Sequence, residues 1–471
     1  MSIDSRVTPE RAPRRTTDMP AHQAPRRSVD LAVLAQRHAR LLRVAYLLCI
    51  GIATLLHAGF DSSVPHLLER VHRALQFELH YRDAVDAVRN LALFFGWGAT
   101  YVLTARAPTT RRDVVMATLI GTVASITVES AQLFAQTRQA SLMDVCTNTI
   151  GALAGALALA AVEHRAIGSM RRGTLIGVPG WFPAGALLLT AVGLTFAPST
   201  RPSQVIGWSA SPIARMETVL QISPAPVPWV GLCVDALVWL AVGLAVAMTI
   251  SDRTGRVRTR HLLVWLVVGP GALALTHAGR MLVGLQREAL APAIQGGALG
   301  FGLLAGLALV PMWRRRVTAR ATRAAHLGLL IAAVGAAMAW TPAWWVTVAP
   351  GTSAFAWQQL VPMLSLLMRQ DMSSVFLVLQ RAGLGAAIGA CLAARKRVGA
   401  PRPGIWSAVA YAGLLELGQY VVPGRYPDIT DVLITGAAAG LMLALVERAD
   451  RSPDELPASS GDDLERSAAH G

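Results

Sequence analysis

The sequence predicts an all-α polytopic membrane protein, a transmembrane helical bundle of about twelve spans in three tandem four-helix units. Of its 471 residues, 53% are hydrophobic and only 15% are charged, and the mean hydropathy is +0.45, which soluble domains do not reach. The apolar residues form runs of roughly 17–25 residues, enough for a helix to cross about 30 Å of hydrocarbon. In addition, a polar motif occurs twice, near both ends of the apolar region.

Twelve spans are expected from these apolar runs. They lie near residues 42–60, 90–105, 114–134, 142–163, 175–197, 226–250, 261–280, 293–313, 325–349, 373–394, 404–422 and 430–447. The run at 175–197 is interrupted by Pro179 and Pro183, which makes it the weakest of the set.

The uneven distribution of arginine sets the expected orientation. Loops 106–113, 164–173, 251–260, 314–323 and 395–402 contain 19 of the 43 basic residues. Because basic loops stay in the cytoplasm, we expect these loops and both termini to be cytoplasmic. The net charge of +15 is then a consequence of topology, and it does not indicate nucleic-acid binding.

The motif that occurs twice is a set of acids, amides and an arginine around a short connection. The first copy holds Glu129, Gln132, Arg138 and Asp144, and the second holds Glu416, Gln419, Arg425 and Asp431 at the same offsets. Residues three or four apart share one helix face. Each copy therefore predicts a helical hairpin whose polar groups converge at one depth, on the outer side of the membrane.

Further candidates flank the two motifs. Asn148 lies four residues after Asp144, Asp86 and Asn90 share a face of the second span, and Arg381 lies in the tenth span. A charge at mid-membrane costs roughly 2.5–3.5 kcal/mol, so each such residue needs a partner or a purpose. Small-residue spacing predicts close helix packing at Gly151, Gly155, Gly436 and Gly440.

The loop lengths and the motif spacing predict internal duplication with parallel units. The expected organisation is a disordered basic tail at 1–40, four-helix units at 41–165, 174–315 and 324–447, and a disordered acidic tail at 448–471. In the middle unit Asp235 stands alone, and we interpret this unit as having lost the motif.

The first motif, preceded by the stretch from Asn90 to Gly98, resembles the VanZ-like family of bacterial membrane proteins. In the second copy Thr435 replaces the asparagine and Ala438 the first glycine. The resemblance implies a multi-pass protein of the bacterial cytoplasmic (inner) membrane with a role in the cell envelope. The founding member of the family is associated with teicoplanin resistance.

Two interpretations of the motif stay open. In one, an outward pocket binds an anionic or glycan envelope precursor, lipid-linked in form, through Arg138 and Glu129. In the other, Arg138 neutralises Glu129 and Asp144 in a structural clip. A transporter or lipid flippase and a non-catalytic scaffold are the alternatives. The sequence contains no CxxC pair and no HExxH motif, so we expect no metal or cofactor. It leaves open the oligomeric state and whether a reaction is catalysed.

Overall fold

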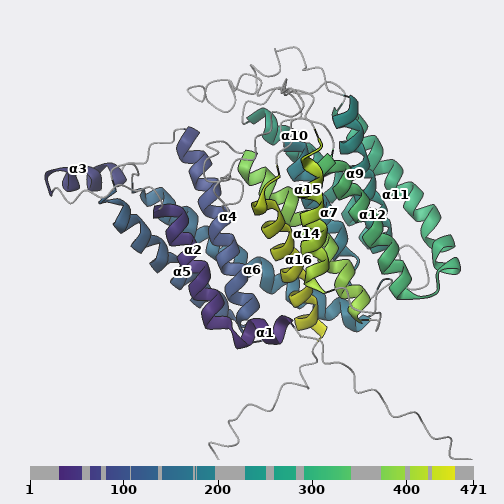
Figure 1. The fold of residues 1–471 in the computed structure, drawn as a ribbon, viewed down its shortest axis with the longest axis horizontal. Coiled ribbons are helices and arrows are strands. Elements are labelled where there is room, and N and C mark those ends of the chain that lie inside the picture. Colours follow the sequence, from purple (N-terminus) through teal and green to yellow (C-terminus); the bar gives the residue numbers. More distant parts are fainter. Residues whose placement is uncertain are drawn as a thin grey trace, which may run out of the picture.

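The computed structural model of the chain is a bundle of α-helices (Figure 1). The structure describes residues 31–55, 64–75, 81–106, 108–135, 140–172, 176, 178–196, 229–250, 259–282, 291–340, 373–397, 404–422 and 427–450. Within these ranges 91% of the residues are helical and none forms a strand. The predicted all-α membrane bundle is therefore confirmed.

A helix occupies each of the twelve expected apolar runs. In chain order these helices are α2 (Ala39–Leu55), α4 (Tyr81–Thr104), α5 (Arg111–Gln132), α6 (Leu142–Arg172), α7 (Trp181–Phe196), α9 (Trp229–Ile250), α10 (Thr259–Leu282), α11 (Ala291–Arg316), α12 (Arg320–Trp340), α14 (Ser373–Arg397), α15 (Ile405–Gln419) and α16 (Ile429–Asp450). Seven of them, namely α5, α6, α10, α11, α12, α14 and α16, are long and apolar enough to cross a membrane, and α7 and α9 contain shorter apolar stretches. The number twelve stays a prediction.

Helices α4 and α6 pack in parallel at very short range. A Cβ atom on Gly151 would lie 2.4 Å from the carbonyl oxygen of Leu91, and one on Gly155 would lie 2.0 Å from that of Phe95. Both helices advance by four residues between these contacts, so they run in the same direction. Only glycine permits this approach. The register places Asn90 at the level of the first turns of α6.

The same parallel contact occurs in the other two helix groups. A Cβ on Gly302 of α11 would lie 2.3 Å from the carbonyl oxygen of Leu240 on α9, and one on Gly385 of α14 would lie 2.2 Å from that of Thr435 on α16. Each of the three helix pairs therefore joins the second and fourth helix of an expected unit.

Two glycines of α16 that were expected to pack helices face a different neighbour. Gly436 lies against Val409 and Gly440 against Ile405, both on α15. The close approach between α14 and α16 depends instead on glycines of α14, Gly385 and Gly389.

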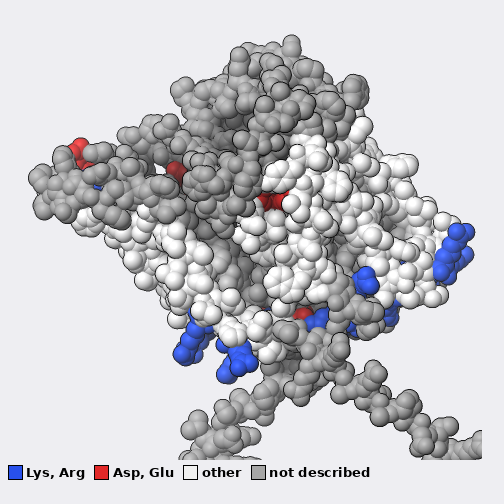
Figure 2. Space-filling model, in the orientation of Figure 1, with Lys and Arg blue, Asp and Glu red and all other residues white. Residues whose placement is uncertain are grey.

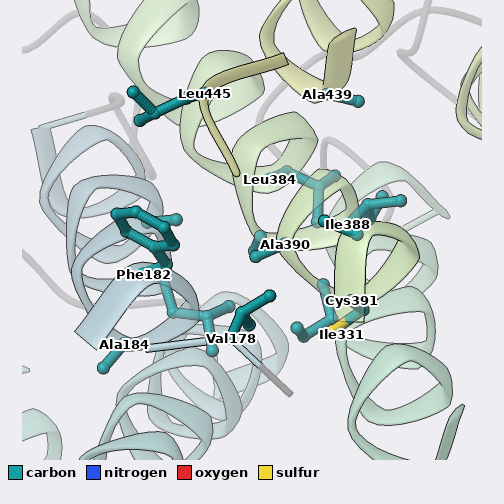
Figure 3. Packing of buried hydrophobic residues seen from close by; sticks show 14 of the residues in the cluster. Val178, Phe182, Ala184, Ile331, Leu384, Ile388, Ala390, Cys391, Ala439 and Leu445 are labelled. Atoms are coloured by element: carbon teal, nitrogen blue, oxygen red, sulfur yellow. The ribbon is translucent and has the colours of Figure 1, made fainter. Parts of the chain in front are cut away.

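Helices far apart in the sequence share one apolar core. Helices α2, α4, α5 and α6 lie at one side of the bundle, α14, α15 and α16 lie near its centre, and α9, α11 and α12 lie at the other side (Figure 1). Helix α7 packs on both α14 and α9. In Figure 3, Phe182 of α7 lies among buried residues that include Leu384 and Ala390 of α14.

The two ends of the bundle differ in charge. In Figure 2 the visible Lys and Arg side chains gather toward the lower end and edge of the molecule. We call this the arginine-rich end; α6, α11, α14 and α16 finish there and α5 and α12 begin there. We call the opposite end, where α5 and α15 finish and α6 and α16 begin, the hairpin end.

Both expected tails are shorter than predicted where they meet the bundle. Helix α1 (Leu31–Arg37) and the start of α2 occupy the last part of 1–40, and α16 extends to Asp450. Arg448, predicted to begin the acidic tail, is only 1% exposed. The remainder of each tail lies outside the described residues.

An amphipathic helix follows α2 at the hairpin end. Helix α3 (Val64–Ala74) exposes Leu68 and Val71 and lies at the edge of the bundle in Figure 1. Its Arg70 donates two hydrogen bonds from Nη1, to the carbonyl oxygens of Leu133 (3.0 Å) and Ala135 (2.9 Å). This guanidinium caps the C-terminal end of α5, whose last carbonyl groups have no partner within the helix.

Candidate functional site

The second hairpin holds a buried ion cluster centred on Arg381. Arg381 of α14 donates from Nε to Oδ2 of Asp431 at 2.8 Å, and its Nη2 lies 2.7 Å from the same oxygen and 3.1 Å from Oε1 of Glu416. All three residues are 5% exposed. One guanidinium thus bridges α14, α15 and α16, and two carboxylates surround it away from solvent.

Glu416 also fixes the start of the next helix. Its Oε2 accepts a hydrogen bond from the backbone N–H of Asp428 at 3.0 Å, and its Oε1 accepts one from Nε2 of Gln419 at 2.7 Å. Asp428 in turn caps α16, because its Oδ1 accepts from the N–H of Thr430 at 2.8 Å. The spacing of Glu416 and Gln419, which the first hairpin shares, thus places Glu416 where it holds the beginning of α16 against α15.

The first hairpin repeats this backbone contact. Oε2 of Glu129 accepts a hydrogen bond from the N–H of Ser141 at 2.9 Å, and Oγ of Ser141 accepts from the N–H of Met143 at 3.2 Å, capping α6. Glu129 is 8% and Gln132 7% exposed. The expected placement of Glu129 inside the hairpin, rather than toward lipid, agrees with this geometry.

Asn148 of the first hairpin is a buried amide with one atom that has no described partner. Its Nδ2 donates to Oγ of Ser125 on α5 at 2.8 Å, and one turn away Thr122 and Thr149 share a hydrogen bond of 3.0 Å. The side chain is 3% exposed, yet its Oδ1 has no hydrogen-bond partner among the described residues. A buried amide oxygen without a partner is costly, and native proteins contain few of them.

The other candidates of the first hairpin are more accessible. The side chain of Asp86 is 44% exposed, and its Oδ1 lies 3.5 Å from Nη1 of Arg89 on the same helix. Asn90 and Asp144 are half-buried. At the corresponding level of α14 the second hairpin has Arg381, whereas α4 has the uncharged Asn90. The two hairpins therefore differ in their buried charge.

The role expected for the hairpin arginines stays a prediction. Arg138 and Arg425 lie outside the described residues. Among the described residues of the second hairpin, Arg381 contacts both acids, and it comes from the preceding span. Sequence comparison of the two motifs missed this pairing because α4 has no arginine at the equivalent position.

The middle unit contains a buried polar chain that the sequence analysis missed. Nε2 of Gln295 on α11 donates to Oδ2 of Asp235 on α9 at 3.1 Å, and Oε1 of Gln295 lies 2.9 Å from Nε2 of His277 on α10. Gln295 is fully buried and Asp235 is 7% exposed. The interpretation of Asp235 as isolated was wrong, because Gln295 and His277 lie 60 and 42 positions away and fit no motif.

Comparison with known proteins concerns the first hairpin and the helices around it. Residues 43–163 match the family model described as VanZ/LLP1. The chain carries a VanZ-like domain. This domain includes Glu129, Asp144, Asn148 and the glycine contact of α4 with α6, whereas the second hairpin lies outside the matched residues. No curated protein and no solved structure matches the chain.

Metal-ligating side chains are not grouped in the described part of the chain. Within those ranges no three His, Cys, Asp or Glu side chains are grouped closely enough to hold a metal ion. The described side chains of the first hairpin can form hydrogen bonds through carboxylates, amides and hydroxyls, and Arg89 lies near the accessible Asp86.

Proposed function

We propose that the VanZ-like domain binds the hydroxyl-bearing head group of a lipid-linked cell-envelope precursor at the first hairpin. The observation that carries this proposal is the buried Asn148 amide with one atom lacking a partner. The atom without a described partner is the acceptor Oδ1. A ligand hydroxyl can donate to it and can also accept from a neighbouring donor.

The surroundings of Asn148 favour a polyhydroxylated ligand. Ser125, Thr122 and Thr149 supply hydroxyls on the two helices, and Glu129 supplies a carboxylate at the hairpin end. Carboxylates and amides of this kind recognise sugar hydroxyls through pairs of hydrogen bonds. Arg138, in the connection, is the expected contact for an anionic group of the same precursor.

The second hairpin supports a structural role instead. Arg381 already contacts Glu416 and Asp431, and all three are buried. A guanidinium that neutralises two carboxylates is the clip that the sequence analysis considered for both hairpins. We therefore assign binding to the first hairpin and helix fixation to the second.

The interior of the domain favours binding over transport. Below the hydroxyl pairs, toward the arginine-rich end, Nε1 of Trp97 donates to the carbonyl oxygen of Ala117 at 2.8 Å. Gly121 lies against the Trp97 ring and Ala152. This apolar contact closes the polar path between α4, α5 and α6. A flippase would need polar groups to continue past it, so flux of labelled glycolipid in proteoliposomes separates the two functions.

The test is native mass spectrometry of the full-length protein purified in mild detergent. Asn148→Leu and Glu129→Gln should lose a co-purifying lipid-linked glycan that the wild type retains. Thr435→Val is the matched control, since Thr435 takes the place of Asn148 in the second hairpin and is 2% exposed. Equal glycan retention in all four proteins would contradict the proposal, and loss in Thr435→Val as well would indicate a general structural effect.

A role in glycopeptide resistance follows from the same binding proposal. If the domain sequesters or presents a precursor that teicoplanin targets, a strain expressing wild-type protein should tolerate more teicoplanin than one expressing Asn148→Leu at equal protein level. If the two strains are equally susceptible to teicoplanin, precursor binding by this domain does not cause resistance.

A further inference from the structure

Two arginines at the arginine-rich end have buried nitrogen atoms without acceptors. Arg323 of α12 is 7% exposed, and its Nη2 donates to the carbonyl oxygen of Thr318 at 3.2 Å. The Nε atoms of Arg323 and of Arg395 on α14 are both buried and have no hydrogen-bond partner in the described ranges. Burying a charged donor without an acceptor costs several kcal/mol, so a native protein that keeps one usually supplies the acceptor from elsewhere.

The packing of α12 against α14 brings the two arginines to one level. A Cβ on Gly328 would lie 3.5 Å from Cβ of Cys391, and one on Gly335 would lie 3.0 Å from a side-chain carbon of Leu384. From Gly328 to Gly335, α12 advances by seven residues. The contacts on α14 move back by seven residues, from Cys391 to Leu384. The two helices are therefore antiparallel. Continuing this register by one turn aligns Ala324, the neighbour of Arg323, with Arg395.

Among the described residues, no carboxylate is paired with Arg323 or Arg395. Arg314 and Arg320 interact electrostatically with Arg323, and both carry the same charge. On α14 the next two residues do have acidic partners. Lys396 pairs with Glu447 of α16, and Arg397 pairs with Asp450 at 2.8 Å. The structure thus places acids beside Lys396 and Arg397 and assigns none to the Nε atoms of Arg323 and Arg395.

We propose that Arg323 and Arg395 form a binding site for a phosphate group between the start of α12 and the end of α14. A phosphate oxygen accepts from guanidinium nitrogens in pairs, which suits two arginines with vacant Nε atoms. The first turn of α12 adds its unpaired N–H groups and the positive end of the helix dipole. Arg314 and Arg320 contribute further positive charge at the rim.

The phosphate has two chemical sources. One is the head group of an anionic phospholipid, because the site lies at the end of membrane-spanning helices that carries most of the arginines, where basic pockets between helices bind such lipids. The other is a soluble phosphate. Both present the same acceptor oxygens, and they differ in whether the ligand is retained from the bilayer or added from solution.

The experiment uses the full-length protein in nanodiscs of either phosphatidylcholine alone or phosphatidylcholine with phosphatidylglycerol. Retained phosphatidylglycerol is counted by native mass spectrometry after release, and the apparent melting temperature is followed with and without inorganic phosphate. Arg323→Gln and Arg395→Gln remove the two proposed ligands. Arg315→Gln is the matched control, since Arg315 is exposed in the last turn of α11, at the same arginine-rich end, and the charge change is identical.

We expect phosphatidylglycerol to stay on the wild type and on Arg315→Gln, and to fall by about tenfold in Arg323→Gln and Arg395→Gln, the ratio for one lost charge-assisted hydrogen bond. Arg323→Lys, which keeps the charge and folds more readily, should retain part of the binding. Stabilisation by inorganic phosphate in pure phosphatidylcholine would instead assign the site to a soluble anion. Equal lipid retention in all variants, together with no effect of phosphate, would overturn the proposal.

Discussion

Arg448 of α16 donates from Nε to Oε1 of Glu163 on α6 at 2.7 Å, which joins two helices 285 residues apart in the sequence. The pair is almost fully buried, with side chains 1% and 2% exposed. Arg448 also donates to the carbonyl oxygens of Leu103 (3.0 Å) and Arg106 (2.9 Å) at the end of α4. This guanidinium therefore fastens the C-terminal helix to the VanZ-like domain.

Removing one partner of this pair should destabilise the whole bundle. Arg448→Met leaves the Glu163 carboxylate buried without its cation, which costs about 3–5 kcal/mol in such sites. We expect a large drop in the apparent melting temperature in detergent, and limited proteolysis should release α16 first. The double variant Arg448→Met/Glu163→Met should recover part of the loss. An unchanged melting temperature for Arg448→Met would show that the contact contributes little.

The ion cluster of the second hairpin should behave as a structural clip. Arg381→Met leaves Glu416 and Asp431 buried without their cation and should also cost about 3–5 kcal/mol. Arg89→Gln is the matched control, because its pair with the largely exposed Asp86 is screened by solvent and contributes less than about 1 kcal/mol. Thermal unfolding measures the loss of stability in Arg381→Met and in Arg89→Gln. Glycan retention by the surviving folded Arg381→Met protein should match the wild type, and its selective loss would instead place ligand binding at the second hairpin.

The parallel contact of α4 with α6 should depend on the absence of a side chain at Gly155. Its Cβ would lie 2.0 Å from the carbonyl oxygen of Phe95, so Gly155→Ala forces the helices apart and should cost roughly 1–3 kcal/mol. Gly413 of α15 has nothing within 4 Å of its Cβ position, and Gly413→Ala should be neutral or slightly stabilising. If both substitutions lower the melting temperature equally, close helix approach is not the reason.

The polar chain of the middle unit should be sensitive at its central residue. Gln295→Leu removes the donor to Asp235 and the contact of His277 together, and we expect a loss of about 1–3 kcal/mol. Asp235→Leu/Gln295→Leu should be less destabilising than Gln295→Leu alone, since it removes the buried carboxylate too. A double-mutant comparison by thermal unfolding tests this. Simple additivity of the two substitutions would mean that the residues do not act as a unit.

The candidate site was predicted in part. The offsets of Glu129 and Glu416 correctly indicated side chains directed into the two hairpins, because helical periodicity and short connections are local properties. The cation of the second hairpin could not be assigned, since Arg381 approaches from a helix that the motif does not contain. The same limit applies to Gln295, which contacts both Asp235 and His277 only after three helices have packed.

Sequence patterns alone predict the all-helical membrane class, the positions of the described apolar helices and the two hairpins, because hydrophobic runs and i, i+3/i+4 spacing act over a few turns. Which charges are paired depends on the packing of the helices. Arg448 meets Glu163, Arg381 meets Asp431, and the Nε atoms of Arg323 and Arg395 meet no described acceptor, because ion pairing in a bundle depends on which helices pack side by side and in what register. Glycine contacts and the shape of the core determine which helices pack together. These features involve residues hundreds of positions apart, so no local sequence pattern encodes them.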